Sequence, residues 1–318
     1  MGEGKDHIMR ILVTGGGGFV GGAAVQALLS RGDSVIAFDT HFSPQWAAHE
    51  RLITVHGDIT DMAGVAQVMM KHRPDAVIHA AAIVGVLSSI GSPLNVVRVN
   101  IEGSLNVFES MRLAGVKRCV HISSEETYGA FRTDKIDEDH PLNPVYPYGI
   151  SKATVEHLGR SYRDVHGLEV LNVRTCSVYG VGLPRDRIPK NVVEAALAGR
   201  KLHIPTGAEM AIDHTYIEDT VSGTLAILDH PQHRHDAYNI ASGRVVTLGE
   251  IVAIVRELVP GSELSIGPGP ARHGDQVEMV RKGALDVTRV ATELGWRPKY
   301  DIRSGLTAYI GALRRKGV

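Results

Sequence analysis

A tyrosine and a lysine four positions apart are the first residues whose types and spacing could do chemistry. The run Pro147–Lys152 (PYGISK) is predicted to open a helix, and Tyr148 and Lys152 then share one face. A lysine cation beside a phenol lowers the pKa of the phenol, which makes the tyrosine a base usable near neutral pH. Many helices carry such a pair on their surface. Here Ser123-Ser124 ends an apolar strand about two dozen residues earlier, which favours a catalytic interpretation.

A glycine-rich turn is the second candidate. The run Ile11–Gly21 (ILVTGGGGFVG) predicts a strand that enters glycines directly and continues into a helix. Glycines allow a tight turn and let backbone N–H groups approach a pyrophosphate, and the helix N-terminus adds partial positive charge. The spacing Gly15, Gly18, Gly21 therefore predicts a dinucleotide phosphate site.

Two aspartates are expected at the adenosine end of the same cofactor. Asp39 ends the second predicted strand, where a carboxylate can accept from both ribose hydroxyls and repel a 2′-phosphate. The sequence thus favours NAD over NADP. Asp58, after the next strand, is expected to meet the adenine.

The elements that position these residues alternate between short apolar runs and longer amphipathic stretches. This alternation predicts an α/β fold, a Rossmann-type doubly wound parallel sheet, followed by a smaller mixed α/β C-terminal substrate lobe. We expect an NAD-binding domain over 10–175, with return segments near 213–242, and a substrate-binding lobe over 176–212 and 243–318. Two late strands, 237–240 and 264–266, are expected to be isolated. The alternating runs are Ile11–Thr14, Phe19–Ser30, Ser34–Asp39, Leu52–His56, Met62–His72, Ala76–His79, Leu94–Ala114 and Cys119–Ser123.

Composition excludes several classes of protein. The 318 residues carry 34 Lys and Arg against 35 Asp and Glu, a net charge of 34 − 35 = −1, which argues against a general nucleic-acid-binding surface. Two cysteines do not make a disulfide framework, and the histidines of 229–235 (DHPQHRH) are better explained as a solvated turn than as a metal site. Since no apolar run approaches the roughly 20 residues of a membrane span, we expect a cytoplasmic protein with no membrane partner. Residues 1–9 are expected to be disordered or an expression extension.

Taken together, these motifs resemble the extended short-chain dehydrogenase/reductase family, the NAD-dependent epimerases and dehydratases of sugars. The resemblance covers essentially all of Arg10–Tyr309. The residues that carry it are the glycine run 14–21, Asp39, Gly57–Ile59, His79–Ala82, Asn100, Ser123-Ser124, Tyr128-Gly129, Tyr148 with Lys152, Arg174 and Leu294–Pro298.

The resemblance implies a transient oxidation of a sugar. Tyr148 would remove a hydroxyl proton, Ser124 would hydrogen-bond the same oxygen, and Lys152 would hold the cofactor ribose and tune the tyrosine. Family members commonly pair through a four-helix bundle, here about 94–114 and 148–166, so a homodimer is expected. The implied cofactor contacts are Gly15, Gly18, Phe19, Val20, Gly21, Asp39, Asp58, Ile59, Ala80, Ala81, Ala82, Asn100, Tyr148, Lys152 and Cys176.

The reaction remains open between several outcomes because Glu125 and Glu126 follow the serine. Epimerases commonly have small residues there, whereas the pair resembles the Asp-Glu stretch of sugar 4,6-dehydratases. Two adjacent carboxyls could eliminate water if burial kept one of them protonated. We favour a sugar epimerase acting through a 4-keto intermediate. The alternatives are a 4,6-dehydratase and a decarboxylase of nucleotide-linked uronic acids.

The substrate is expected to be a nucleotide-linked sugar, although the usual diphosphate arginine is replaced by Ile212. Arg185, Arg187, Lys190 and His214 could compensate for it, although Arg185 is better explained as an ordinary solvated loop charge. A free sugar or sugar acid remains the alternative, which would make the protein a net dehydrogenase. The intact Ser124, Tyr148 and Lys152 argue against a non-catalytic NAD sensor. The substrate contacts implied by the resemblance are Ser124, Glu125, Ser177, Asn191 and Arg272.

Overall fold

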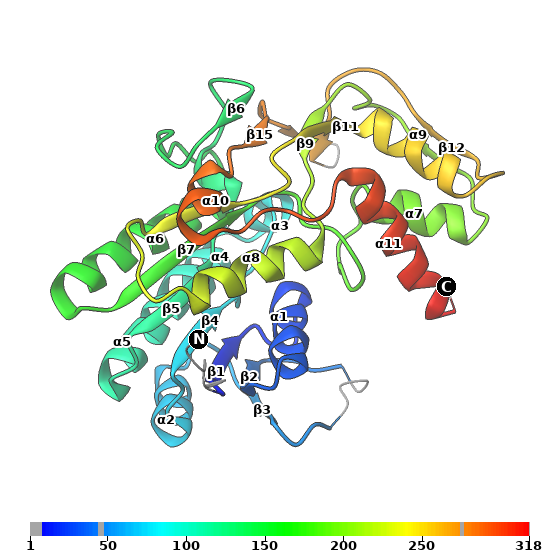
Figure 1. Ribbon diagram of the computed structural model, residues 1–318. Coiled ribbons are helices and arrows are strands. Elements are labelled where there is room, and N and C mark those ends of the chain that lie inside the picture. Colours follow the sequence, from blue (N-terminus) through cyan, green and yellow to red (C-terminus); the bar gives the residue numbers. More distant parts are fainter. Residues whose placement is uncertain (1–7, 44–47, 274–276, 318) are drawn as a thin grey trace. The chain divides into compact units, whose positions relative to one another are not determined.

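A computed structural model of the protein describes residues 8–43, 48–273 and 277–317. Within this part of the chain, seven strands form one sheet in the order β10-β7-β5-β4-β1-β2-β3 (Figure 1). This is the strand order of a doubly wound dinucleotide-binding sheet. The strands are β1 Arg10–Thr14, β2 Ser34–Asp39, β3 Leu52–His56, β4 Ala76–His79, β5 Arg118–Ile122, β7 Glu169–Thr175 and β10 Ala237–Ile240.

Apart from β10, these strands pair in parallel with their neighbours. Helices pack on both faces of the sheet. Side chains of successive strand residues point to opposite faces. One face packs Leu12, Val77 and Cys119 against three helices, and α1 packs on β1 and β2. The helices are α1 Phe19–Ser30, α2 Met62–His72, α5 Gly103–Ala114 and α6 Pro147–His166. The last three are those that pack on the face of Leu12, Val77 and Cys119.

Contacts divide the chain into two compact units. The first comprises the described residues through Ser123, together with Tyr146–Val173 and Thr224–Ala237. The predicted first domain also included 124–145, whereas the structure groups this segment with the second unit. The reason is that β6 (Lys135–Ile136) pairs with β15 (Ala284–Leu285), far along the chain.

The second unit is built from small two-stranded sheets and short helices. In it β9 pairs with β11, β8 with β12 and β13 with β14. The strands are β8 Leu202–Ile204, β9 Ala211–Asp213, β11 Val245–Thr247, β12 Leu264–Ile266, β13 Arg272–His273 and β14 Val277–Glu278. The helices are α7 Lys190–Leu197, α9 Leu248–Leu258, α10 Thr288–Leu294 and α11 Ile302–Arg315, while α8 Ile217–Asp229 spans the boundary of the units.

Two expectations about local structure were wrong. The strands at 237–240 and 264–266 are not isolated, because β10 joins the large sheet and β12 pairs with β8. The expected helix 94–114 is interrupted: a short α4 (Pro93–Val96) leads into a π-helical turn, Val97–Glu102, before α5 begins. The turn α3 (Val86–Gly91) precedes them.

No helix in the described segments is long and apolar enough to span a membrane. The expectation for residues 1–9 falls largely on 1–7, which lie outside the described residues.

Candidate functional site

The glycine loop between β1 and α1 turns tightly against its neighbours, as expected of a dinucleotide phosphate loop. Gly15 has φ +70°, and a Cβ there would lie 2.6 Å from the amide nitrogen of Ala81. A Cβ on Gly21 would lie 2.0 Å from the Gly15 carbonyl oxygen. Any larger residue at either position would push the loop away from its neighbours. The loop therefore forms a backbone cradle that leads into α1, whose first residues, Phe19 and Val20, are half-buried.

Asp39 lies beside this cradle in the first unit. Its Oδ2 accepts a hydrogen bond of 3.0 Å from the Gly17 amide, and its Oδ1 accepts from the His41 amide at 3.2 Å. A carboxylate at the end of β2, linked to the phosphate loop, suits a ribose without a 2′-phosphate. Asp58 is exposed just after β3 and accepts from the Thr60 amide at 2.8 Å. The neighbouring Ile59 side chain packs in the core, so its backbone is the part available to a cofactor.

Asn100 links the loop after β4 to the helix of the tyrosine. Its Oδ1 accepts from the Ile83 amide at 2.7 Å, and its Nδ2 donates to Ser151 Oγ at 2.9 Å. Ser151 Oγ in turn donates to the carbonyl of Tyr148 at 2.7 Å. The π-helical turn around Asn100 is a local distortion often found at functional sites. The side-chain amide of Asn100 thus connects Ile83, in the loop after β4, to Ser151 near the start of α6.

Tyr148 and Lys152 occupy the first two turns of α6, and both side chains are buried. Lys152 Nζ donates to the Ile122 carbonyl at 2.6 Å and is 3.3 Å from His121 Nε2. Burial lowers the pKa of Lys152 to about 7, with the charge of Glu156 opposing this effect. The lysine therefore sits where the loss of its charge is within reach of neutral pH.

Ser124 begins a single 3₁₀ turn in the second unit, directly after the Ser123 that ends the first segment of the first unit. Its Oγ accepts from the Glu126 amide at 3.2 Å, so its own hydrogen stays available to donate. Covalent continuity puts Ser124 two residues beyond the Ile122 carbonyl that Lys152 binds. The serine is thus held by the backbone of the acidic stretch that follows it.

A buried lysine stands between the two glutamates of this stretch. Lys282 Nζ lies 3.0 Å from Glu126 Oε1 and 3.6 Å from Glu125 Oε2, and its side chain is 1% exposed. Burial raises the pKa of Glu125, although the ammonium of Lys282 opposes this effect. Sequence reasoning missed Lys282, because beside Arg281 it looks like an ordinary solvated charge.

A second group of polar side chains lies after β7 in the second unit. Cys176 is buried, and its Sγ donates to the Asp213 carbonyl at 2.8 Å. Ser177, at φ +42°, accepts a hydrogen bond from Arg187. The His214 side chain is buried with its Nε2 unpartnered among the described residues, and burial lowers its pKa to about 3, with the charge of Arg187 adding to the effect. Arg187 is therefore a cation close to Ser177 and His214, and its charge also acts on the carboxyl of Glu125.

The other predicted substrate residues lie on separate elements of the second unit. Asn191 is half-buried in the first turn of α7, and Arg272 is 41% exposed on β13 with Glu278 3.8 Å away. Ile212, which replaces the expected arginine, is buried on β9. Lys190 is held by Asp186 and Glu194, at 2.7 and 3.2 Å, and is already paired.

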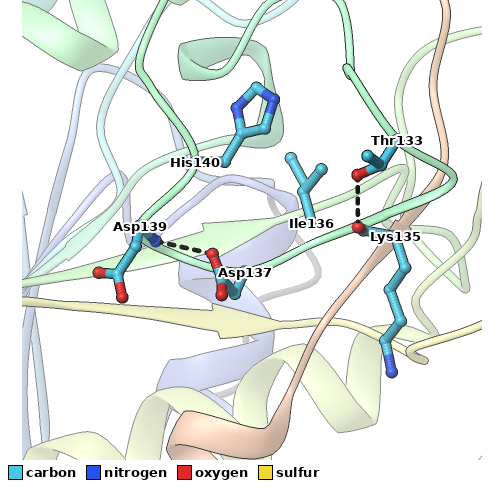
Figure 2. Close-up of a pocket in the computed structure, with 6 residues that line it drawn as sticks. All are labelled: Thr133, Lys135, Ile136, Asp137, Asp139 and His140. Carbon is cyan, nitrogen blue, oxygen red and sulfur yellow. Dashed lines mark hydrogen bonds between the residues drawn. The ribbon is translucent and has the colours of Figure 1, made fainter.

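A shallow hollow on the segment between β5 and α6 contains none of the predicted site residues. It is lined by Thr133, Lys135, Ile136, Asp137, Asp139 and His140 (Figure 2). Thr133 donates to the Lys135 carbonyl and Asp137 accepts from the Asp139 amide, while Lys135 and Asp139 form ion pairs with Asp286 and Arg289. Among the described residues, no three His, Cys, Asp or Glu side chains gather as metal ligands.

The predicted residues divide into two sets, one in each unit. The glycine loop, Asp39, Asp58, Ala80–Ala82, Asn100, Tyr148 and Lys152 belong to the first unit, and Ser124, Glu125, Cys176, Ser177, Asn191 and Arg272 to the second. The cradle at Gly15 and the carboxylate of Asp39 fit NAD.

Known proteins resemble the chain over nearly its whole length. The model of the NAD dependent epimerase/dehydratase family matches residues 11–241. A UDP-glucose 4-epimerase from Lactobacillus helveticus is 28% identical over 92% of this chain and 93% of its own. A dTDP-glucose 4,6-dehydratase from Xanthomonas campestris pv. campestris is 30% identical over 93% of this chain and 90% of its own. The solved structure of the UDP-glucose 4-epimerase from Thermotoga maritima with UDP-glucose matches with a TM-score of 0.89 and 29% identity, covering 98% of this chain and 100% of that chain.

Proposed function

Because the chain belongs to the NAD-dependent epimerase/dehydratase family, we propose that it is an epimerase of a nucleotide-linked sugar that works through a transient 4-keto intermediate. When bound, NAD supplies a hydride acceptor that can return the hydride to the same carbon. The glycine loop would hold the pyrophosphate, Asp39 the adenosine ribose and Asp58 the adenine. Lys152 would hold the second ribose.

The protein side of the chemistry is a proton transfer. Tyr148 takes the proton of the sugar hydroxyl, and Ser124 donates a hydrogen bond to the same oxygen. The cation of Lys152 stabilises the tyrosinate form of Tyr148 that accepts this proton. In the return step Tyr148 gives the proton back, so this set of residues serves both directions of an epimerisation.

The ion pair of Glu126 with Lys282 is the observation that favours an epimerase function over a dehydratase function. Elimination of water needs one carboxyl to donate a proton and another to accept one. The ammonium of Lys282 lies 3.0 Å from Glu126 Oε1 and 3.6 Å from Glu125 Oε2, so it engages both carboxyls that the elimination would use. The acidic pair is therefore held as an internal ion cluster.

Dehydration is the second candidate function, and Glu125 favours it. Burial raises the pKa of Glu125, which favours its protonated form. A protonated carboxyl is what the donation of a proton to a leaving hydroxyl requires. Relatives of both kinds match the chain. The two functions differ in product, so they separate cleanly by experiment.

Arg187 and Arg272 support a nucleotide-linked substrate. Ile212 is buried and offers no charge, whereas Arg187 is a half-buried cation beside Ser177 and His214. A guanidinium can bind two phosphate oxygens at once, which suits a diphosphate. The relatives named for UDP- and dTDP-sugars point the same way.

The proposal includes a homodimer formed by one face of the first unit. Figure 1 shows α5 beside α6, and the two helices pack against each other. Leu94, Val97, Ile150 and Val165 on these elements and the turns before α5 are 45–79% exposed. Burying them against a second copy would remove apolar surface from water. If so, Leu94→Glu with Ile150→Glu gives a monomer in sedimentation velocity, and an unchanged dimer would contradict this assignment.

A cytoplasmic location is also part of the proposal, and it is supported by two buried free thiols.

The test of the function is product analysis with UDP-glucose, UDP-glucuronic acid and dTDP-glucose in the presence of NAD. Epimerisation inverts C4 at unchanged mass, dehydration removes one water, and a net dehydrogenase accumulates NADH. We expect inversion, abolished by Tyr148→Phe. We also expect Lys282→Met to raise the fraction of dehydrated product, since Glu126 then loses its cation. Turnover that survives Tyr148→Phe would refute the assignment.

A further inference from the structure

Two fully buried histidines lie beneath Lys152 in the first unit. His79 on β4 and His121 on β5 stack with ring centroids 5.6 Å apart and an interplanar angle of 29°. Both occupy strand positions that are otherwise apolar, where an unpaired polar group would be costly. Each ring nitrogen has a hydrogen-bond partner. The directions of these hydrogen bonds determine which nitrogen carries hydrogen.

The chain of hydrogen bonds that ends at Lys152 begins at a backbone carbonyl. The Asp236 carbonyl can only accept, and Asn172 Nδ2 donates to it at 2.9 Å. The oxygen of the same amide, Oδ1, therefore faces His121 Nδ1 at 2.9 Å and must accept from it. A neutral ring with hydrogen on Nδ1 has a lone pair on Nε2. That lone pair lies 3.3 Å from Lys152 Nζ.

The partner ring is held in the opposite tautomer. Ser104 Oγ donates to the Asn100 carbonyl, so it accepts from His79 Nε2 at 2.9 Å. His79 Nδ1 then accepts from the hydroxyl of Thr14 at 2.6 Å. Burial lowers the pKa of His79 to about 3 and that of His121 well below its usual value, which agrees with the hydrogen-bond directions.

We infer that His121 is a positioning residue for Lys152: Asn172 locks its ring in the Nδ1–H form, so that Nε2 accepts a hydrogen bond from the lysine ammonium. This inference rests on the proposed function only in giving Lys152 a role at the cofactor. Tyr148 precedes Lys152 by one turn of α6. Among the described residues, Glu156 on α6 and His79 on β4 also act on the pair, while β7 contributes the neutral Asn172.

The arrangement leaves one direction open to the ammonium. The Ile122 carbonyl and His121 Nε2 take two of the three N–H groups of Lys152, at 2.6 and 3.3 Å. The third N–H is then the one that can reach a ribose hydroxyl. Two acceptors on the buried side also stabilise the charged form against the desolvation that lowers the pKa of Lys152.

The first test reads the tautomer without any substrate or cofactor. Long-range ¹H–¹⁵N correlation spectra of protein labelled in its histidines distinguish Nδ1–H from Nε2–H, and the signal that disappears in His121→Gln identifies His121. We expect the Nδ1–H form from about pH 6 to 9. In Asn172→Leu the lock is removed, and we expect the ring to lose this single form. A wild-type ring with hydrogen on Nε2 would overturn the inference.

The second test measures NAD affinity against pH by titration calorimetry. Loss of a hydrogen bond to a charged group should move the high-pH fall in affinity down by about one to two pH units in His121→Leu. His121→Gln keeps an acceptor near the Nε2 position and should move it much less. His79→Gln, equally buried but bonded to Thr14 and Ser104, is the matched control and should leave the midpoint in place.

The two tests remain separate from the sugar chemistry. An unmoved midpoint in folded His121→Leu would overturn the inference even if the enzyme epimerises sugars. If His121→Leu does not fold, the wild-type tautomer and Asn172→Leu decide. A protein that shows the tautomer and the pH shift but converts no sugar would contradict the proposed function alone.

Discussion

Lys282→Met would remove the ammonium that lies near both Glu125 and Glu126 while keeping a side chain of similar length. The lysine nitrogen lies 3.0 and 3.6 Å from the two carboxylates. At an effective dielectric constant of about 20, each attraction is about 5 kcal/mol, and desolvation offsets much of it. Removing one partner of a buried ion pair typically costs about 3–5 kcal/mol, because a charge remains buried without compensation. We expect a loss of that size near pH 8.

The loss should depend on pH in a definite direction. Without the cation, burial raises the folded-state pKa of Glu125 above the unfolded value of 4.5, so the folded variant binds a proton more tightly than the unfolded chain does. The destabilisation is therefore largest above the raised pKa and shrinks as pH falls toward 4.5. Urea unfolding of both proteins at a series of pH values between about 5 and 8 measures the difference directly.

Arg281→Met is the matched control for this experiment. Arg281 precedes Lys282 and pairs with Asp134, but these side chains are 54% and 96% exposed. An exposed pair of this kind contributes less than about 1 kcal/mol. A Lys282→Met loss that is equally small, or that is the same at every pH, would refute the buried ion cluster.

Three further predictions follow from the same structure. Gly15→Ala should weaken NAD binding at least about tenfold in calorimetry, because the added Cβ would lie 2.6 Å from the backbone nitrogen of Ala81. Gly115→Ala is the control: Gly115 has φ +76° but open space around it, so the change should leave NAD binding as it is and cost about 1 kcal/mol in stability. Asp39→Asn should weaken NAD binding and narrow the preference over NADP, and an unchanged preference would remove Asp39 from the ribose site. Burial lowers the pKa of His79 and of His214 to about 3, so below about pH 6.5 these histidines bind protons in the unfolded chain but not in the folded protein. Each histidine should therefore lower the free energy of unfolding by about 2 kcal/mol between pH 6.5 and pH 5. A free energy of unfolding that stays constant from pH 7 to 5 would contradict this.

The parts of the fold that the sequence predicts well are those built from local patterns. The expected bounds of α1, β2, β3 and α2 coincide with the observed ones, since each is a short apolar or amphipathic run between turn residues. The break before α5 was not predictable in this way. The π-helical turn coincides with the bonds of Asn100 to Ile83 and Ser151, residues far apart in the sequence.

The same distinction applies to the candidate site. The glycine loop and the Tyr148–Lys152 pair are visible as motifs because their members are close in sequence. Lys282 is not, since its partners lie more than 150 positions earlier and nothing around it marks it as buried. His121 did leave a signal, a histidine within the apolar run Cys119–Ser123, which a strand buried on both faces does not tolerate without partners.

The first unit receives its last piece late in protein synthesis. The segment Thr224–Ala237 supplies the carbonyls that Arg118 binds, those of Leu228 and His230, and the Asp236 carbonyl that orients Asn172. A nascent chain that has only reached Thr175 already contains the glycine loop and the Tyr148–Lys152 pair, yet Arg118 and Asn172 still lack these acceptors. Folding of the first unit can therefore be completed only after some 60 further residues have left the ribosome. During this interval the incomplete unit exposes unpaired polar groups to which a chaperone could bind.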